Sequence, residues 1–331
     1  MTAVVPHVAP IPVRPETPLL SLVTPAWRET ENLPKLHAEI VQVLDAAGIE
    51  WEWIIVDDHS PDATWDTVLQ LSLRDPRVRG VRLARNAGSH NATRYGLTQA
   101  SGKTAAVLAA DLQDPPAVLP QLLARWREGH RVVWAVRRHR EGESRGTIIF
   151  SRLYYWLMSH VAGMPQMPPT GADFVLLDRC VVDALSAFRE SSANLYALIA
   201  WMGFDQASVE YDKQARLYGT SGWTLGKKLT LVIDSLTSFT FAPIRWMSVV
   251  GFLSTLFALG WAAVILRNAV YGHPVEGWTS VMLAILLLGG LQMIMLGVLG
   301  EYLWRALDES RRRPRHLVEH RTFDPPSKPR E

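Results

Sequence analysis

Two uncharged apolar segments near the carboxyl end of the chain constrain its fold most strongly. Residues 248–266 read SVVGFLSTLFALGWAAVIL, and residues 278–300 read WTSVMLAILLLGGLQMIMLGVLG. Each is close to the ~20 apolar residues that cross ~30 Å of hydrocarbon as a helix. The sequence therefore predicts two membrane-spanning helices within residues 246–304. A buried helical hairpin in a soluble core is the alternative, which the length and the lack of charge disfavour.

The basic residues around these segments predict their orientation. The connecting loop, NAVYGHPVEG, has no Lys or Arg beyond Arg267 at its edge, whereas WRALDESRRRPRHLVEHR follows the second segment. Cytoplasmic loops carry an excess of Lys and Arg. We therefore expect a multi-pass protein of the inner (cytoplasmic) membrane, with both termini and a basic tail, 305–331, in the cytoplasm.

The remaining composition narrows the class of protein. Residues 1–18 are rich in proline and lack a cleavable signal, which predicts a disordered lead-in. The single cysteine, Cys180, excludes an internal disulfide and indicates a reducing compartment. The formal net charge of +2 gives no indication of a nucleic-acid partner.

Short apolar runs alternate with helical patterns between residues 19 and 137. The expected strands are 19–25, 52–58, 79–86, 104–111 and 131–137, and the expected helices are 31–48, 62–73, 90–100 and 116–129. This alternation predicts an α/β domain with a mostly parallel sheet covered by helices on both faces. Ligands bind beyond the carboxyl ends of such strands. The polar residues at those ends, suited to a nucleotide site, are Thr24, Asp57, Asp58, Asn86 and Asp111.

An amphipathic segment precedes the first apolar segment. In residues 223–241, WTLGKKLTLVIDSLTSFTF, apolar side chains recur at helical spacing, and Lys227 and Lys228 fall outside that stripe. A helix of this kind directly before a membrane span favours the lipid interface over a soluble core. We assign residues 222–245 to a juxtamembrane amphipathic helix.

The motif VDDHSPD, residues 56–62, follows the second expected strand. The carboxylates of Asp57 and Asp58 lie where they can accept hydrogen bonds from a base N–H and from ribose hydroxyls. A helix cap is the structural alternative for this motif, and Ser60 or Asp62 is the expected capping residue. His59 and His90 are expected in loops or at the surface, and His59 is close enough in sequence to touch a nucleotide.

The motif AADLQDPP, residues 109–116, follows the fourth expected strand. Alternate residues of an extended chain point to the same side, so Asp111 and Gln113 can share one ion. Hard cations prefer oxygen ligands. The motif therefore predicts a site for Mg²⁺ or Mn²⁺ that neutralises a leaving diphosphate, and a polar turn is the alternative.

Seven motifs and the two apolar segments together resemble the polyprenyl-phosphate glycosyltransferases of glycosyltransferase family 2. In order, the motifs are TPAW, VDDHSPD, RNAGSHNA, DLQDPP, FSRLYY, GADFVLLDR and RLYGTSGW. That group includes dolichyl-phosphate mannose synthase and the bacterial undecaprenyl-phosphate glucosyltransferases. The resemblance covers roughly residues 19–315 and implies a cytoplasmic GT-A catalytic domain over residues 19–221, which moves a sugar from a nucleotide donor to a lipid phosphate.

The resemblance also implies roles for residues at the donor site. Asp57 matches the family's aspartate that recognises the base, with Thr24 and Pro25 beside it. Asn86 and Gly88 match the family's Asn-x-Gly turn near the nucleotide.

The metal motif of the resembled family is Asp-x-Asp-x-Gln, and this chain keeps only part of it. Asp111 and Gln113 match its second aspartate and its glutamine, but Ala109 replaces the first aspartate. We expect lower metal affinity unless Asp114 or water supplies the missing oxygen.

Basic residues carry the implied acceptor site, since arginine grips phosphate oxygens in a bidentate manner. The positions that bind the acceptor phosphate by resemblance are Arg137, Ser151 and Arg216, with Arg145 as a looser match. Arg216 and Ser221 belong to RLYGTSGW, a loop expected to close over the donor, or else an inert linker. Asp111 and Arg216 are the expected catalytic residues, and Asp173 is either a group that orients a hydroxyl or part of a turn.

The acceptor determines the expected mechanism. A phosphate monoester, with a second pKa of ~6, is already largely ionised at neutral pH. The enzyme then needs no catalytic base and has only to align the reactants and neutralise charge. The resemblance implies a single displacement with inversion.

The donor and the partners follow from the same resemblance. Glucose from UDP-glucose is the preferred donor, with an aminosugar, galactose or mannose as alternatives. Because Ala109 replaces the first aspartate of the metal motif, a catalytically weak nucleotide-sugar-binding membrane scaffold is the other hypothesis.

Small residues in the second apolar segment permit close contacts between helices. These residues are Gly289, Gly290, Gly297 and Gly300. A homo-oligomer is expected, a tetramer by resemblance, with a separate flippase and a downstream glycosyltransferase.

Overall fold

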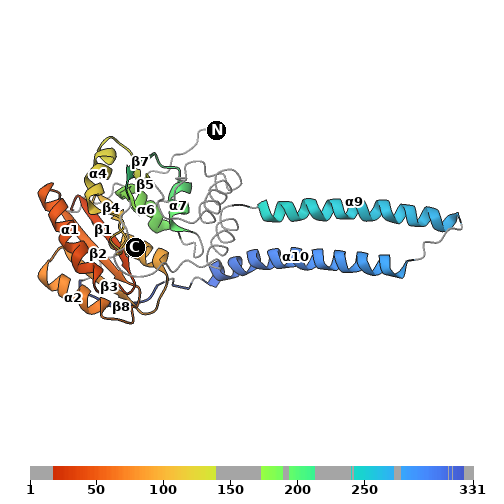
Figure 1. Ribbon diagram of the computed structural model, residues 1–331, viewed down its shortest axis with the longest axis horizontal. Helices are drawn as coiled ribbons and strands as arrows, with labels where there is room; N and C mark the ends of the chain where they lie inside the picture. Colours follow the sequence, from red (N-terminus) through yellow and green to blue (C-terminus); the bar gives the residue numbers. More distant parts are fainter. Residues whose placement is uncertain are drawn as a thin grey trace, which may run out of the picture.

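The computed structural model describes residues 18–138, 173–188, 194–212, 240, 242–271, 277–311, 313–314 and 316–323. These residues form an α/β domain and two long helices that extend away from it (Figure 1). Several predictions lie outside the described residues. They are those for the lead-in before Pro18, for Arg145, Ser151, Arg216 and Ser221, and for nearly all of the juxtamembrane helix before Ala242.

One eight-stranded sheet organises the α/β domain, in the order β7-β5-β6-β4-β1-β2-β3-β8. The strands are β1 Leu20–Ala26, β2 Trp51–Asp57, β3 Val78–Leu83, β4 Thr104–Val107, β5 Val132–Arg137, β6 Val175–Asp178, β7 Gln206–Tyr211 and β8 Val318–Arg321. β6 is antiparallel to both of its neighbours and β8 is antiparallel to β3, whereas the other pairs are parallel. The predicted mostly parallel α/β sheet is confirmed.

Helices cover both faces of the sheet. They are α1 Asn32–Ala46, α2 Thr64–Arg74, α3 Ser89–Gln99, α4 Leu119–Arg127, α6 Arg179–Ala187 and α7 Leu195–Trp201, with a short 3₁₀ turn over Pro116–Val118 before α4. The apolar faces of α1, α2 and α4 build one core, and those of α3, α6 and α7 build the other. Side chains of β2 alternate between the two cores, Trp53 and Ile55 in the first and Ile54 and Val56 in the second. This explains the continuous apolar run from Trp53 to Val56.

The AADLQDPP segment differs from the prediction in one respect. β4 ends at Val107, so Asp111 and Gln113 do not lie on a strand, and Leu112 has a φ of 59°. The strand argument for their pointing to one side is therefore wrong. The apolar run extends beyond β4 because Leu108 and Ala110 are buried in the core. As expected, the prolines then lead into the next helix.

The segment after the second long helix takes part in the sheet. β8 pairs with β3, and Figure 1 shows it beside that strand. The Gly80 amide donates to Thr322 Oγ1 at 2.8 Å, and the Thr322 amide donates to the Gly80 carbonyl at 3.0 Å. On one face, Arg321 Nη2 donates to the Tyr95 hydroxyl at 2.7 Å. The carboxyl-terminal segment thus closes one edge of the domain.

The two long helices are α9 Ala242–Val270 and α10 Trp278–Arg311. By length and composition they contain two candidate membrane spans, Ala242–Asn268 and Leu287–Arg311. Large apolar side chains along them are exposed, Trp246, Phe257 and Trp261 among those of α9. Exposed apolar surface of this extent indicates membrane association.

Contacts between α9 and α10 are sparse around the glycines. A Cβ at Gly251 would meet Met295 Cε at 3.2 Å, which marks one close approach. Within the described part of the chain, a Cβ at Gly289, Gly290, Gly297 or Gly300 would meet no atom within 4 Å. The predicted close packing at these four glycines therefore remains a prediction for contacts between copies of the chain.

Candidate functional site

The sheet directs the chemically useful side chains to one edge. β1, β2, β3 and β4 are parallel and end there, β5 and β7 end at the same edge, and the antiparallel β6 begins there. Asp57 ends β2, Arg137 ends β5, and Tyr211 ends β7. Asp173 lies just before β6, and Asp111 lies shortly after β4. Residues from very different parts of the chain therefore meet at the carboxyl edge of the sheet.

Several residues with strained backbone conformations lie at this edge. Three described residues other than glycine have positive φ, namely Arg28 at 62°, His59 at 61° and Leu112 at 59°. They follow β1, β2 and β4 respectively. Left-handed residues of this kind cost on the order of 1–3 kcal/mol each and cluster at ligand sites. Their position supports a binding site beyond these three strand ends.

Asp57 presents an unused hydrogen-bond acceptor at this edge. The residue is 0% exposed, and its Oδ1 accepts a hydrogen bond from the Ser60 amide at 3.0 Å. Among the described residues, Oδ2 has no hydrogen-bond donor, and Arg82 Nε lies 3.7 Å from it. An unsatisfied buried acceptor costs about 1–3 kcal/mol. A ligand N–H directed at Oδ2 would recover that free energy.

Asp58 and Thr24 have their polar atoms engaged inside the domain. The Asp58 carboxylate accepts hydrogen bonds from the amides of Ala87 at 2.7 Å and Gly88 at 2.9 Å. Burial raises the pKa of Asp58, although these two hydrogen bonds oppose the shift. Thr24 Oγ1 accepts from Trp53 Nε1 at 2.8 Å. Both side chains hold the site's framework, and their predicted contacts with a nucleotide stay predictions.

The turn that Asp58 holds carries two more of the predicted nucleotide-binding residues. Gly88 precedes α3 and has a φ of 87°, a conformation that favours glycine. Asn86 is exposed, and Pro25 within β1 is half-buried. Asp58 therefore links the end of β2 to the amino end of α3, where backbone amides favour an anion such as a phosphate.

The AADLQDPP segment offers one accessible carboxylate. Asp111 is half-buried, and its Oδ1 accepts a hydrogen bond from the Gln113 amide at 3.3 Å. Asp114 is buried and accepts a hydrogen bond from the Tyr211 hydroxyl. In the part of the chain that the structure describes, no three His, Cys, Asp or Glu residues are grouped as a metal site. The donor set fits a cation held by few protein oxygens and completed by diphosphate and water.

Arg137 brings a permanent positive charge to the same edge. Its side chain is 18% exposed, and Nη2 donates to Asp173 Oδ2 at 3.4 Å. Burial lowers the pKa of Arg137, but the neighbouring Asp173, Tyr211 and Asp114 outweigh burial and raise it overall. Its buried Nε has no hydrogen-bond acceptor among the described residues. The guanidinium is therefore charged and has a free donor, as a site for a phosphate requires.

Tyr211 connects Arg137 to the AADLQDPP segment. Burial and the negative charge of Asp114 raise the pKa of Tyr211, so its hydroxyl remains protonated and donates to that carboxylate. Arg137 interacts with the same hydroxyl. Sequence analysis missed Tyr211, although QASVEY, residues 206–211, has the apolar–polar alternation of a strand that ends at this edge.

His90 differs from its prediction as a loop or surface residue. It lies in α3 with its ring centroid 5.4 Å from that of Tyr196, and its Nδ1 is buried. Burial lowers the pKa of His90, which keeps the imidazole neutral near pH 7. The residue belongs to the packing behind the site because α3 turns its ring toward α7.

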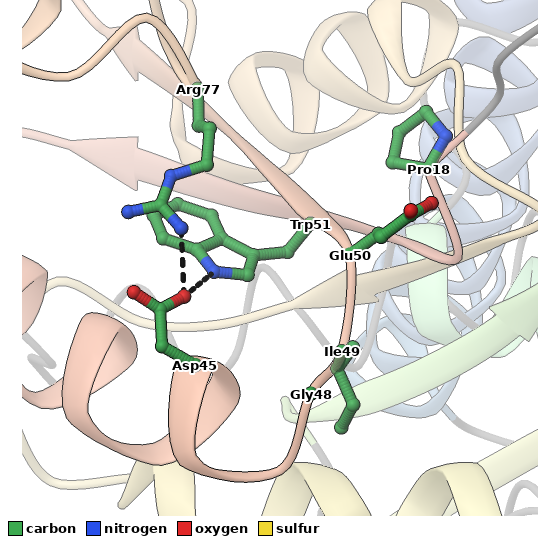
Figure 2. Close-up of a pocket in the computed structure, with 7 residues that line it drawn as sticks. All are labelled: Pro18, Asp45, Gly48, Ile49, Glu50, Trp51 and Arg77. Carbon is green, nitrogen blue, oxygen red and sulfur yellow. Dashed lines mark hydrogen bonds and ion pairs between the residues drawn. The ribbon is translucent and has the colours of Figure 1, made fainter.

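A pocket at the opposite edge of the sheet is structural in character. Figure 2 shows Asp45 accepting hydrogen bonds from both Arg77 and Trp51 beside the start of β2. The distances are 2.7 Å from Arg77 Nη1 and 2.9 Å from Trp51 Nε1, and the Arg77 guanidinium lies 3.9 Å from the Trp51 ring centroid. These polar groups satisfy one another, and the pocket is remote from the strand ends that carry the site.

Comparison with known proteins identifies the family. Residues 21–175 match the model for Glycosyl transferase family 2. An uncharacterized glycosyltransferase of Synechocystis sp. is 35% identical over 300 residues, which cover 90% of this chain and 94% of the relative. The chain belongs to glycosyltransferase family 2. This glycosyltransferase is also 32% identical to the bactoprenol glucosyl transferase of Shigella phage SfV, over 91% of this chain and 98% of the relative.

Solved structures show more distant likenesses. Glucosyl-3-phosphoglycerate synthase from Mycobacterium tuberculosis, in complex with Mn²⁺, uridine diphosphate and phosphoglyceric acid, is 17% identical with a TM-score of 0.48, covering 66% of this chain and 77% of that one. Mannosyl-3-phosphoglycerate synthase from Rubrobacter xylanophilus is 16% identical with a TM-score of 0.47, covering 66% and 71%. The sheet of the glycosyltransferase described here is mixed and mostly parallel.

Proposed function

We propose that this glycosyltransferase moves glucose from UDP-glucose to undecaprenyl phosphate and releases UDP. The observation that carries the proposal is the match to bactoprenol glucosyl transferases over nine-tenths of both chains, which includes the two apolar helices as well as the catalytic domain. Bactoprenol is a polyprenol, and a polyprenyl phosphate resides in a membrane. An enzyme that carries its own apolar helices can meet such an acceptor at the lipid surface.

The donor's base would bind at Asp57. A uracil ring has one N–H, which can donate to the unused Asp57 Oδ2. The diphosphate would then extend toward the amino end of α3 and the turn at Asn86 and Gly88. Asp111 and Gln113 would hold Mg²⁺ or Mn²⁺ beside it, and the cation would offset the charge of the leaving diphosphate.

The acceptor phosphate would bind at Arg137. A phosphate oxygen attacks the anomeric carbon, a new C–O bond forms, and the bond from that carbon to the diphosphate oxygen breaks with inversion. The electron pair leaves with UDP, and no proton has to be removed from an acceptor that is already ionised. Arg145, Ser151, Arg216 and Ser221 complete this site in the proposal, on sequence resemblance alone.

The setting of the enzyme follows from the two apolar helices. The α/β domain would face the cytoplasm of a bacterial cell, at the inner membrane, with the connection between α9 and α10 on the far side. A tetramer, a separate flippase and a downstream glycosyltransferase belong to the same proposal. The two apolar helices among the described residues are too few for a lipid-transporting protein, so another protein would have to move the product across the membrane.

A transfer assay tests the proposal. Full-length protein in detergent receives undecaprenyl phosphate, Mg²⁺ or Mn²⁺, and one radiolabelled UDP- or GDP-sugar at a time. We expect label in the lipid phase from UDP-glucose, lost with EDTA and in Asp111→Ala. Asp205→Ala is the matched control, since this exposed aspartate pairs with His130 at the opposite edge of the sheet.

Ala109 supports one competing function. A chain that lacks the first metal-motif aspartate can bind a nucleotide sugar without turning it over. Binding of UDP-glucose by the protein, with no lipid product from any donor or metal, would replace the enzyme by a nucleotide-sugar-binding membrane scaffold. Lipid product from another donor alone would retain the enzyme and correct the sugar.

A further inference from the structure

β8 brings a carboxylate to the rim of the donor site from the far end of the chain. Glu319 Oε2 lies 3.2 Å from Arg82 Nε and 3.5 Å from His59 Nδ1. His59 is the strained residue after β2, and its Nδ1 also donates to the Leu83 carbonyl at 3.1 Å. Glu319 therefore contacts two side chains that flank Asp57.

Arg82 stands between two carboxylates. Its Nε is 3.2 Å from Glu319 Oε2 and 3.7 Å from Asp57 Oδ2 and makes a hydrogen bond to neither, so both contacts are ion pairs by charge alone. Its Nη2 donates to the Ser60 carbonyl at 3.4 Å. The guanidinium is closer to the partly exposed Glu319 than to the buried Asp57. Asp57 Oδ2 has no hydrogen-bond donor among the described residues.

We propose that Glu319 is a positioning residue for the donor nucleotide: it holds Arg82 away from Asp57, so that Asp57 Oδ2 stays available to the base. The inference rests on the proposed function only in taking a nucleotide as the ligand. It extends that function by assigning a part of the donor site to the segment that follows the second apolar helix.

The competition between the two carboxylates has a physical basis. Opposite charges attract each other more strongly where water is excluded, and the guanidinium can approach either carboxylate. Without Glu319, Arg82 would move onto Asp57, which is 0% exposed and whose Oδ2 has no other donor among the described residues. That contact would occupy the atom that a base N–H needs.

Glu319 contributes little to folding by comparison. Its side chain is 39% exposed, and exposed ion pairs contribute at most modestly to stability. The backbone pairing of β8 with β3 and the Arg321–Tyr95 contact do not involve the Glu319 side chain. A change at Glu319 can therefore alter donor binding while the strand remains in place.

Binding of UDP to full-length protein in detergent tests the inference. Isothermal titration calorimetry gives the Kd, and the transfer assay gives KM and kcat for UDP-glucose. For Glu319→Gln we expect a Kd for UDP and a KM roughly tenfold higher, the scale of one lost charge-assisted hydrogen bond, with kcat within about twofold of the parent. Glu319→Asp should recover part of the affinity.

Two further variants distinguish the positioning of Arg82 by Glu319 from an effect of β8 packing on the domain. Arg321→Ala removes the contact of β8 with Tyr95 on the other face and should leave the Kd for UDP within about twofold. In an Arg82→Gln background, Glu319→Gln should add less than about twofold, because the side chain that it restrains is gone.

The outcomes that overturn the inference are distinct from failure of the proposed function. An unchanged UDP affinity in Glu319→Gln would overturn the inference. So would an equal loss of UDP affinity in Arg321→Ala, or the full Glu319→Gln loss of affinity in the Arg82→Gln background. If unaltered protein binds UDP but makes no lipid product, the enzyme proposal fails while the Glu319 inference can still be tested. If it binds no nucleotide, both fail at the donor.

Discussion

The Tyr211 hydroxyl donates a hydrogen bond to Asp114, and this contact joins the end of β7 to the segment that carries Asp111. The same hydroxyl interacts with Arg137. One phenol thus connects the proposed metal segment with the proposed acceptor cation.

Tyr211→Phe should therefore lower both stability and turnover. Removing the hydroxyl takes away one hydrogen bond to a buried carboxylate, which costs about 1–3 kcal/mol. We expect a lower unfolding temperature and a reduced kcat in the transfer assay. Tyr271→Phe, at an exposed tyrosine after α9, is the control and should change neither. Parent-like kcat in Tyr211→Phe would show that the contact only supports the fold.

Asp57→Asn should weaken nucleotide binding more than it weakens the fold. The amide keeps the size of the side chain but removes the negative charge and places an N–H donor where the base N–H would approach. We expect a Kd for UDP at least about tenfold higher, measured by calorimetry, because a charge-assisted hydrogen bond is replaced by a clash of donors. Asp205→Asn serves as the control. UDP binding equal to that of the parent would remove Asp57 from the donor site.

The domain's central strands were predictable because they are buried on both faces. β1 and β2 are mostly apolar over seven residues each, and the predicted strands agree with the observed ones to within one residue at each end. β8 could not be found in this way. The strand is four residues long and mostly exposed. Thr322, directly after it, hydrogen-bonds to Gly80, which lies 242 positions earlier in the chain. A short polar edge strand carries no periodic signal.

Site residues were predictable where a motif carried them and not where sheet order created them. Asp57 stands in VDDHSPD, and its position at a strand end followed from the motif. The Tyr211–Asp114 and Glu319–Arg82 contacts depend on which strands are neighbours, and strand order is not written in local sequence. Thr24 gives a further example: its hydroxyl accepts a hydrogen bond from Trp53 on the neighbouring strand β2, and its contact with a nucleotide stays a prediction.

Arg137→Gln should act on the acceptor rather than on the donor. The variant keeps a polar side chain but loses the charge that would bind the lipid phosphate. We expect the KM for undecaprenyl phosphate to rise roughly tenfold or more, while the Kd for UDP stays within about twofold. Arg125→Gln, which removes an exposed arginine paired with Glu128 on α4, is the control. A rise in the Kd for UDP instead would place Arg137 at the donor diphosphate.

Asp75 should make stability depend on pH at the acidic end. Burial raises the pKa of Asp75, but hydrogen bonds from Arg77 and His37 outweigh burial and lower it to about 2. Because the folded pKa lies below the unfolded value of 3.8, this stabilisation is present above that value and is lost as the pH falls toward 2. The shift corresponds to about 2 kcal/mol at neutral pH.

The variant Asp75→Asn tests this assignment. Its unfolding temperature should lie below that of the parent at pH 7, and the difference should shrink as the pH falls from about 4 toward 2, where the parent loses the same charge. Thermal unfolding in detergent, followed by intrinsic tryptophan fluorescence, gives both curves. Asp183→Asn, at an exposed aspartate of α6, is the control. A difference that stays constant across this range would mean that Asp75 stabilises the domain through its shape and not through its charge.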